Sequence, residues 1–418
     1  MMVGYRCLAC EAERETSFTG FVCPDCGGNL DIVYDYAAAR GKPFPAEGEG
    51  LSRYAALLPV QDLNLASPLR VGQTPLYRAD RLGASVGLHT LWIKDDGLNP
   101  SASFKDRAGA VALVVARERG AKVIAGATTG NAGSSMACLA ASVGMPCVIF
   151  VPESAPAAKL AQLLVFGAKV VAVRGSYDQA FDLCAAVCET RGWFNRNTGV
   201  NPFTREGKKT CSFEVWEQLG RRVPDWVVVP TGDGNIISGI WKGFRDLKEI
   251  GIIDRLPRLL CAQAERSAAV STTVCRLREA EAVPAWKDVV VDSVEATTMA
   301  DSISVDVPRD GLAAVRAVLE SEGDAVTVPD DAILAAIPEL ARGSGVFAEP
   351  AAAAAWACAR KAAQQGLIGP DDEVVCLVTG NGLKDVARVR ESVGAPTVVD
   401  ATVDAVQRAV DELNVPSP

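Results

Sequence analysis

Residues 121–173 read AKVIAGATTGNAGSSMACLAASVGMPCVIFVPESAPAAKLAQLLVFGAKVVAV. Three runs rich in β-branched residues lie within this stretch and begin about 23 residues apart: Lys122–Ala127, Pro146–Val151 and Lys169–Val173. Stretches with helical character separate them. This rhythm is typical of βαβ units, which build a parallel sheet with helices on both faces.

The same alternation continues on both sides of this stretch. Further strands are predicted at Trp226–Pro230, Leu259–Ala264 and Glu373–Val378. Helices are predicted at Asp106–Arg119, Gly133–Val143, Ala157–Phe166, Tyr177–Arg191, Glu206–Leu219, Ile236–Ile250 and Ala351–Gln365. A chain of 418 residues is long enough to divide these units between domains. We therefore predict an α/β fold of two doubly wound domains with a crevice between them.

The composition argues against several classes of protein. Hydrophobic residues make up 49% of the chain and charged residues 22%, which argues against global disorder. The net charge of −9 argues against a nucleic-acid partner, because phosphate binding needs clustered Lys and Arg. No run of 18 apolar residues is present, and the opening MMVGYRCLAC lacks the apolar core of a signal peptide. We therefore expect no membrane association and a cytoplasmic location.

The chain contains one histidine, His89. Two-histidine metalloprotease motifs are therefore excluded, and a Ser-His-Asp triad would have to use His89 itself. We interpret His89 as structural because it precedes the apolar pair Leu91 and Trp92. An enzyme this poor in histidine is expected to take its reactive group from a cofactor.

Four of the 13 cysteines follow a metal-binding pattern. Cys7, Cys10, Cys23 and Cys26 form C-x2-C-x12-C-x2-C, and each C-x2-C turn can aim two thiolates at one tetrahedral zinc ion. A site with four cysteine ligands has no open position, so we predict a structural zinc ribbon over residues 1–34. The alternative is a ribbon that no longer holds metal. The other nine cysteines are scattered singly and are expected to be reduced, buried thiols.

A lysine opens the helix that follows LWIKDDGLNPSASFKDR, residues 91–107. Lys105 would feel the positive end of the helix dipole, which disfavours its protonation. A lowered pKa is what a Schiff-base lysine requires. Taken alone, the pattern is also compatible with a surface lysine beside Asp106.

Three small-residue loops follow predicted strands and precede helical or glycine-rich segments. ATTGNAGSSMACLAA (127–141) offers the amide of Asn131, and VVVPTGDGNIISGIWKGF (227–244) offers main-chain N–H groups around Gly232 and Gly234. VVCLVTGNGLKD (374–385) ends its strand in the hydroxyl of Thr379. A dinucleotide fingerprint would need glycine where Ile237 stands, so the second loop suits a single phosphate. A Walker A loop is also excluded, because the position upstream of GKKT (207–210) where it needs glycine holds proline.

Together these motifs match the needs of pyridoxal phosphate for an imine-forming amine, a partner for the phenolic oxygen, a phosphate site and a partner for the ring nitrogen. At this point the sequence resembles the fold-type II pyridoxal-phosphate enzymes and, among them, the threonine synthase family. The resemblance covers about Gln73 to Asp385, and the ribbon resembles the cysteine module of some family members. It rests on GQTPLY (72–77), NPSASFKDR (99–107), TTGNAGSS (128–135), GDGNIISG (232–239), FAEPAAAAA (347–355) and TGNGLKD (379–385).

The resemblance implies a division of the chain and a cofactor site. The large cofactor-binding domain would comprise residues 72–104 and 201–418, the small mobile domain residues 105–200, and residues 35–71 a wrapping linker. Lys105 would carry pyridoxal phosphate and shuttle protons. The remaining cofactor-binding residues would be Asn131 at the phenolic oxygen, Thr379 at the ring nitrogen, and Gly232, Asp233, Gly234, Asn235 and Ile236 around the phosphate. We expect the Asp233 carboxylate to turn away from that phosphate.

The resemblance also implies a substrate site, formed by Ser103, Thr128, Thr129, Thr204, Arg205 and Lys208. Here the sequence departs from the family, in which an arginine just before a G-x-K-T stretch binds the substrate phosphate. In NTGVNPFTREGKKT (197–210) that position holds Thr204, and Arg205 stands one place late.

The implied reaction converts O-phosphohomoserine and water into threonine and phosphate by γ-elimination and β-addition, in a homodimer. Three alternatives stay open: a β-replacement enzyme acting on O-phosphoserine in the manner of a cysteate synthase, a serine/threonine dehydratase, and a cofactor-binding pseudoenzyme whose ribbon recruits a partner.

Overall fold

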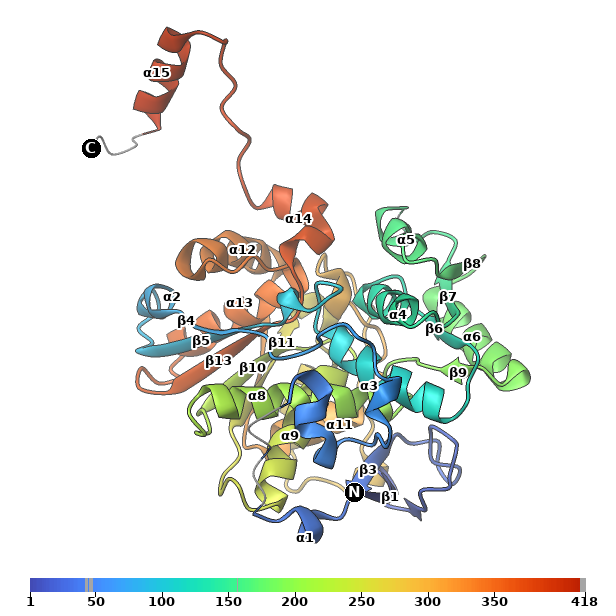
Figure 1. The fold of residues 1–418 in the computed structure, drawn as a ribbon. Helices are drawn as coiled ribbons and strands as arrows, with labels where there is room; N and C mark the ends of the chain where they lie inside the picture. The colour runs from blue at the N-terminus through green and yellow to red at the C-terminus, as the bar shows by residue number, and fades with distance from the viewer. Residues whose placement is uncertain (42–43, 45–47, 156, 414–418) are drawn as a thin grey trace.

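The computed structural model describes residues 1–41, 44, 48–155 and 157–413 of the chain (Figure 1). Within these residues the strands form three sheets. The helices of the described residues are α1 (Tyr36–Ala39), α2 (Asp80–Ala84), α3 (Lys105–Glu118), α4 (Asn131–Ser142), α5 (Ala157–Leu164), α6 (Tyr177–Arg191), α7 (Phe203–Lys208), α8 (Thr210–Gln218), α9 (Asn235–Glu249), α10 (Ala269–Glu279), α11 (Gly311–Glu320), α12 (Asp330–Ser344), α13 (Pro350–Gln364), α14 (Val386–Glu391) and α15 (Val403–Glu412).

The largest sheet has six strands in the order β12-β11-β10-β13-β5-β4. Its strands are β4 (Leu76–Arg78), β5 (Thr90–Asp95), β10 (Trp226–Pro230), β11 (Arg258–Ala264), β12 (Asp324–Val328) and β13 (Glu373–Val378). All neighbours pair in parallel except β4, which runs antiparallel to β5 at the edge.

Both faces of this sheet are covered, which explains why β10 is apolar throughout. Val227 and Val229 pack in one core with residues of α9 and α11, whereas Trp226 and Val228 pack in another with residues of α12 and α13. A strand buried on both faces cannot alternate apolar and polar residues.

The second sheet has four parallel strands in the order β8-β7-β6-β9. These strands are β6 (Ile124–Ala127), β7 (Cys147–Pro152), β8 (Lys169–Val173) and β9 (Phe194–Asn195). Helix α4 covers one face and α6 the other. The βαβ units predicted from residues 121–173 are confirmed, with strand ends within two residues of the prediction.

The N-terminal module is a small antiparallel sheet of order β2-β1-β3, built from β1 (Met2–Cys7), β2 (Glu13–Arg14) and β3 (Leu30–Tyr34). It is not a detached appendage. Tyr5, Leu30 and Ile32 are buried in the same core as Phe203 and Ile237 of the large α/β body.

The predicted linker, residues 35–71, contains short regular elements. It contains α1 and the 3-10 helices η1 (Gly50–Leu57) and η2 (Leu63–Leu65), and Tyr54 packs against Phe213 of α8. Residues 42–43 and 45–47 of this linker lie outside the described residues. The shorter 3-10 helices elsewhere are η3 (Asp96–Leu98), η4 (Glu265–Ser267), η5 (Trp286–Asp288), η6 (Asp301–Ile303) and η7 (Gly382–Asp385).

One further difference from the predicted elements concerns a helix. The single helix predicted at Glu206–Leu219 consists of α7 and α8, which meet at Lys209. The charged tail after residue 390 carries α15, which lies apart from the rest of the molecule (Figure 1). Among the described residues, none of the helices has both the length and the apolar character that crossing a bilayer requires.

Candidate active site

A cavity of about 410 Å³ lies between the two parallel sheets, at the carboxyl ends of β6, β7, β9, β10 and β13. Its volume falls within the range of small-molecule sites, and strand ends are where α/β folds bind ligands. Ten of the site residues predicted above line it: Lys105, Thr128, Thr129, Asn131, Gly232, Asp233, Gly234, Asn235, Ile236 and Thr379.

Main-chain hydrogen bonds bring Lys105 beside Thr379, 274 positions later in the chain. The Phe104 N–H donates to the Thr379 carbonyl at 2.8 Å, and the Asn381 N–H donates to the Ala102 carbonyl at 3.1 Å. Ala102 has φ 61°, a left-handed conformation that costs about 1–2 kcal/mol for a residue with a side chain. Helix α3 then begins at Lys105, so the lysine enters the cavity from the first turn of a helix.

Burial lowers the pKa of Lys105. Asp233 and Glu349 oppose this shift, and the positive charge of Arg196 reinforces it. The expected direction of the pKa shift therefore agrees with the structure, but its cause is desolvation and Arg196. The Lys105 amine makes no hydrogen bond within the described part of the chain, which leaves it free for a ligand.

The glycine loop after β10 is shaped by close packing. Gly234 has φ 88°, and a Cβ there would lie 2.7 Å from Cβ of Ala314 and 2.8 Å from the carbonyl oxygen of Asp310. A Cβ on Gly232 would lie 2.9 Å from Cα of Ile303. Helix α9 begins at Asn235, directly after this loop, and its first residues, Asn235 and Ile236, line the cavity. The N–H groups of the first turn of a helix have no partner within the helix, so this part of the cavity wall suits an anion.

Asp233 was expected to turn away from the phosphate site, but it remains part of the cavity wall. It lines the cavity, its Oδ1 accepts the N–H of Arg309 at 3.4 Å, and burial raises its pKa. Protonation of this carboxyl, which burial favours, would relieve repulsion from a bound phosphate.

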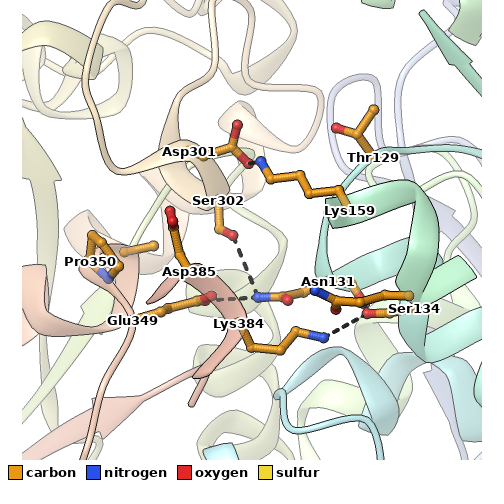
Figure 2. Close-up of a pocket in the computed structure, with 13 residues that line it drawn as sticks. Thr129, Asn131, Ser134, Lys159, Asp301, Ser302, Glu349, Pro350, Lys384 and Asp385 are labelled. Carbon is orange, nitrogen blue, oxygen red and sulfur yellow. Dashed lines mark hydrogen bonds and ion pairs between the residues drawn. The ribbon is translucent and has the colours of Figure 1, made fainter. Parts of the chain in front are cut away.

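Asn131 opens α4 and is held by the opposite wall (Figure 2). Its Nδ2 donates to Oε1 of Glu349 at 2.8 Å and lies 3.5 Å from Oγ of Ser302. Burial raises the pKa of Glu349, and the bond from Asn131 partly offsets that shift. A neighbouring recess shares Asn131, Asp301 and Glu349 with the cavity and holds an ion pair between Lys159 of α5 and Asp301 of η6 at 2.5 Å.

Arg196 lines the cavity and was missed by the sequence reasoning. It is 2% exposed, its Nη1 donates to Oγ1 of Thr198 at 2.9 Å, and its Nη2 donates to the carbonyl of Lys105 at 3.5 Å. Its Nε has no hydrogen-bond partner, and no carboxylate among the described residues pairs with it. Burial lowers the pKa of Arg196 to about 10. The signal that could have found it is the short strand Phe194–Asn195, which ends immediately before this arginine.

Four predicted substrate residues do not line the cavity. Arg205 is buried in ion pairs with Asp310 and Asp31, so its charge is already neutralised. Lys208 donates to Oδ1 of Asn235, and its pKa is lowered well below the usual value by burial and the nearby Lys105. Thr204 donates to the carbonyl of Asn201 at 2.8 Å, and Ser103 is fully buried. These side chains back the cavity wall and do not face a ligand.

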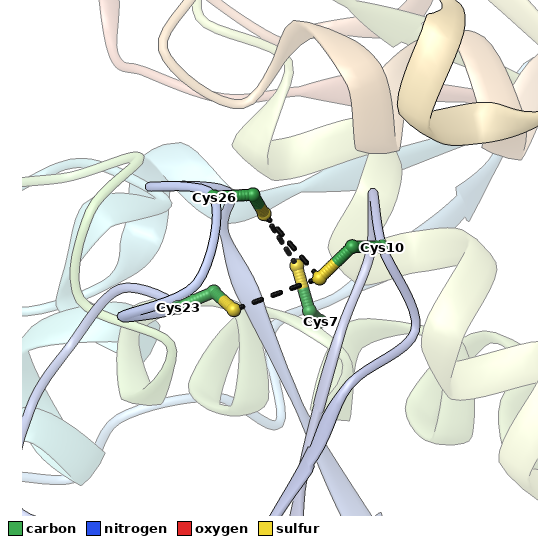
Figure 3. Close-up of side chains that lie close together, drawn as sticks. All are labelled: Cys7, Cys10, Cys23 and Cys26. Atoms are coloured by element: carbon green, nitrogen blue, oxygen red, sulfur yellow. Dashed lines mark hydrogen bonds between the residues drawn. The ribbon is translucent and has the colours of Figure 1, made fainter.

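The four cysteines of the N-terminal module converge (Figure 3). Their sulfur atoms all lie within 4.8 Å of one another, with the pairs Cys7–Cys26, Cys10–Cys23 and Cys10–Cys26 at 3.5, 3.7 and 3.4 Å. A zinc ion at about 2.3 Å from four sulfurs would place them about 3.8 Å apart. A Cβ on Gly28 would lie 3.0 Å from Sγ of Cys7, so the knuckle has no room for a side chain there.

His89 lies on the surface, away from the cavity. Its Nδ1 lies 3.0 Å from Oδ1 of Asp371, and its side chain is 68% exposed. It takes no part in the arrangement around Lys105.

The fold and this site are those expected of a pyridoxal-phosphate dependent enzyme, and the family comparison agrees. Residues 68–380 match the model of the family described as "Pyridoxal-phosphate dependent enzyme", and the chain belongs to that family. The solved structure of processed threonine deaminase isoform 2 from Solanum lycopersicum has the same fold, with a TM-score of 0.64, 21% identity, and coverage of 87% of this chain and 96% of that one.

Similarity to individual proteins is more specific. A threonine synthase of Methanosarcina acetivorans is 37% identical over 98% of this chain and 99% of its own length. A threonine synthase of Methanocaldococcus jannaschii is 35% identical over 98% of this chain and 99% of its own length. The resemblance to the threonine synthase family is therefore confirmed.

The residues present fit the cofactor of this family. The cavity offers an amine with a lowered pKa and no hydrogen bond of its own, an amide, a hydroxyl, and a glycine loop at a helix N-terminus. These are the groups that pyridoxal phosphate requires of a protein.

Proposed function

We propose that this chain is a threonine synthase, a pyridoxal-phosphate dependent lyase that converts O-phospho-L-homoserine and water into L-threonine and phosphate. The observation that carries the choice of a phosphorylated substrate is Arg196. It is a buried guanidinium without a carboxylate partner, in the same cavity as Lys105. A buried unpaired charge is costly, so an anionic ligand that pairs with it is strongly favoured.

In this proposal four groups of the chain hold the cofactor. Lys105 supplies the amine, Asn131 the partner of the phenolic oxygen, and Thr379 the partner of the ring nitrogen. The N–H groups of residues 232–236 supply the phosphate site at the start of α9. When bound, pyridoxal phosphate supplies an electron-accepting ring that makes protons on the substrate carbons removable.

Lys105 is the proposed proton carrier. Because burial and Arg196 lower its pKa, its amine is more readily uncharged, and so more able to accept a proton from a substrate carbon, than that of an exposed lysine. The uncharged hydroxyl of Thr379 fits this role, because it does not force a proton onto the ring nitrogen as a carboxylate would.

Arg196 is the proposed site of the substrate phosphate, in place of the arginine that the family pattern has where Thr204 stands. Its free Nε can donate to a phosphate oxygen. Thr198, which already accepts from Arg196, also lines the cavity and could donate its hydroxyl to the same oxygen atoms. The substrate phosphate would leave from carbon γ beside this positive charge, which stabilises the departing anion.

The proposal includes closure of the small domain over the substrate. Water must stay out until it is added at carbon β. The ion pair between Lys159 and Asp301 joins α5 to η6 in the recess beside the cavity, and closure would tighten this contact.

We also propose that Cys7, Cys10, Cys23 and Cys26 hold one structural zinc ion. The sulfur positions fit a tetrahedral ion with no open ligand position. Metal analysis of the purified protein should find about one zinc per chain, and its absence would contradict this assignment.

We also propose an oligomeric state and a cellular location for the protein. The chain forms a homodimer, which light scattering of the purified protein measures. It works in the cytoplasm, which the 13 free cysteines support because reduced thiols suit a reducing compartment.

The reaction is tested by incubating the protein with O-phosphohomoserine, O-phosphoserine and threonine in parallel. Threonine and phosphate in equal amounts from the first compound are the expected result. Replacement chemistry on O-phosphoserine, or ketoacid from threonine alone, would overturn the assignment in favour of a β-replacement enzyme or a dehydratase.

The Lys105→Ala variant provides the control for the site. Turnover should fall by about 10³-fold or more, because both the cofactor link and the proton carrier are lost. The variant should fold, and borohydride should no longer fix the cofactor to the chain. If the wild-type protein itself stays colourless when the cofactor is added, a binding module without enzymatic activity is favoured over an enzyme.

A further inference from the structure

The cysteine module is linked to the glycine loop through the side chains of Asn29 and Asp310. Asn29 directly follows the second cysteine knuckle, and its carbonyl accepts the N–H of Leu8, the residue after Cys7, at 2.9 Å. Both knuckles therefore fix the position of Asn29. From there its Nδ2 reaches out of the module and donates to Oδ1 of Asp310 and to the carbonyl of Arg309, each at 2.8 Å.

Asp310 also contacts the first residues of α9. It is completely buried, and its Oδ2 accepts from Nδ2 of Asn235 at 2.7 Å and from Oγ of Ser238 at 2.8 Å. Its own N–H donates to the carbonyl of Asp233 at 2.9 Å. The Asp310 carboxylate thus accepts hydrogen bonds from the first turn of α9, and the Asp310 backbone lies against Gly234.

Arg205 of α7 balances the charge of Asp310 and also contacts the module. Arg205 pairs with Asp310, donates to the carbonyl of Leu30 at 3.1 Å, and lies 3.4 Å from Asp31 of β3. Asn235 is in turn held through its oxygen by Lys208. A network of polar contacts therefore runs from the cysteine knuckles to the loop, part-buried at Asn29 and buried from Asp310 onward.

We propose that Asn29 and Asp310 are positioning residues, through which the metal-loaded cysteine module holds the glycine loop in the conformation that binds the cofactor phosphate. Neither residue lines the cavity, so both act through Asn235 and the loop backbone. Binding of zinc to the module and of pyridoxal phosphate to the loop are then thermodynamically coupled, and each tightens the other by the same factor. This inference rests on the proposed placement of the cofactor phosphate at residues 232–236.

The test uses the full-length chain and the Asn29→Asp variant. The substitution keeps the shape of the side chain and the four cysteines but opposes two carboxylates at the contact with Asp310. The matched control is Asn64→Asp, because Nδ2 of Asn64 also donates to an aspartate, Asp62, at 2.9 Å, but on the exposed surface. For each protein the dissociation constant of pyridoxal phosphate is measured by absorbance titration of the cofactor-free form, with zinc bound and after removal of zinc by a chelator.

In the wild type and in Asn64→Asp, zinc removal should weaken pyridoxal phosphate binding about tenfold, within the usual range of coupling between sites. In Asn29→Asp, binding should already be weaker by about that factor, and zinc removal should add less than about twofold. Circular dichroism and zinc content report folding and metal loading independently of activity.

Equal cofactor affinity in Asn29→Asp and the wild type would overturn the proposal, as would zinc removal that leaves the affinity of the wild type unchanged. Loss of affinity in Asn64→Asp to the same extent would also overturn it. If the wild type itself does not bind pyridoxal phosphate, the placement of the cofactor fails, a result that differs from all of these.

Discussion

Arg196 and Lys105 line the same cavity, and the charge of Arg196 helps to lower the pKa of Lys105. Burial lowers the pKa of both, and the charge of each disfavours protonation of a neighbour. With its pKa at about 10, Arg196 stays charged at neutral pH, and its charge favours the uncharged form of Lys105. An anion bound at Arg196 would offset part of its positive charge and so raise the pKa of Lys105.

Replacing Arg196 with glutamine should therefore weaken use of the phosphorylated substrate. The loss of a charge-assisted contact of about 1.5–3 kcal/mol corresponds to a decrease in kcat/KM of about 10- to 150-fold. Steady-state phosphate release measures this. Arg174→Gln is the control, because Arg174 is 88% exposed in its pair with Glu153, and it should stay within about twofold of the wild type. An Arg196→Gln enzyme with unchanged kcat/KM would contradict the assignment.

Asp95, at the end of β5, predicts a dependence of stability on pH. Burial raises its pKa from 3.8 to about 6, so the folded state holds its proton more tightly than the unfolded state does. This contribution to stability is complete below pH of about 4 and is lost as the pH rises through about 6, and amounts to about 3 kcal/mol. In Asp95→Asn it should be absent, and the asparagine oxygen can still accept the Gly97 N–H.

The measurement is urea unfolding of both proteins between pH 4 and 7. The stability of Asp95→Asn relative to the wild type should increase across that interval and then level off. A difference between the two proteins that does not change with pH would contradict the assigned cause.

At the scale of elements, the loop from Gly232 to Asn235 illustrates how packing sets a ligand site. The loop needs glycine at position 234 for two reasons, a φ of 88° and the contact with α11 and Asp310. The first reason is a property of the residue, whereas the second depends on an element 76 positions away in the chain.

Gly234→Ala separates these two reasons when it is compared with Gly120→Ala. Gly120 also has positive φ, 69°, but nothing lies within 4 Å of where its Cβ would be. Gly120→Ala should lower the free energy of unfolding by about 1–2 kcal/mol, the cost of the backbone conformation. Gly234→Ala should cost more and should also weaken pyridoxal phosphate binding by about tenfold or more, because the loop must move. Thermal unfolding and cofactor titration measure the two effects, and equal effects in both variants would contradict the packing argument.

At the scale of the whole molecule, helix α3 carries Lys105 at one end and a buried ionic cluster two residues later. Arg107 pairs with Asp96 at 2.5 Å and with Glu214 of α8 at 2.6 Å, and Lys94 of β5 pairs with Glu214 at 2.7 Å. The cluster fixes α3 against the large sheet, and with it the position of the lysine. Its members are all buried, so removing one leaves an uncompensated charge.

Arg107→Met should therefore lower the free energy of unfolding by about 3–5 kcal/mol. Arg222→Met is the control, since Arg222 is 65% exposed and pairs with Glu373 at 3.2 Å, and it should change stability by less than about 1 kcal/mol. Chemical denaturation measures both. If Arg107→Met proves as stable as the control, the cluster does not hold the molecule together in this way.

Much of the framework could be predicted from local patterns. Strands such as Trp226–Pro230 and Glu373–Val378 begin and end where predicted, because an apolar run between turn residues is a local property of the chain. The cysteine spacing predicted a cluster that the structure brings together, since each C-x2-C turn is a local geometry. Strand β5 escaped prediction because its Lys94 and Asp95 give it a polar character, and burial of Lys94 depends on Glu214, 120 positions away.

The sequence by itself determined the α/β class, the candidate lysine and the glycine loop, because these depend on residue type and short-range order. Only the tertiary structure decided that Arg196 faces the cavity while Arg205 is neutralised by Asp310 and Asp31. Whether a buried arginine is free for a ligand depends on which carboxylates pack against it. Those carboxylates come from segments distant in the chain, and nothing in the local sequence around either arginine specifies them.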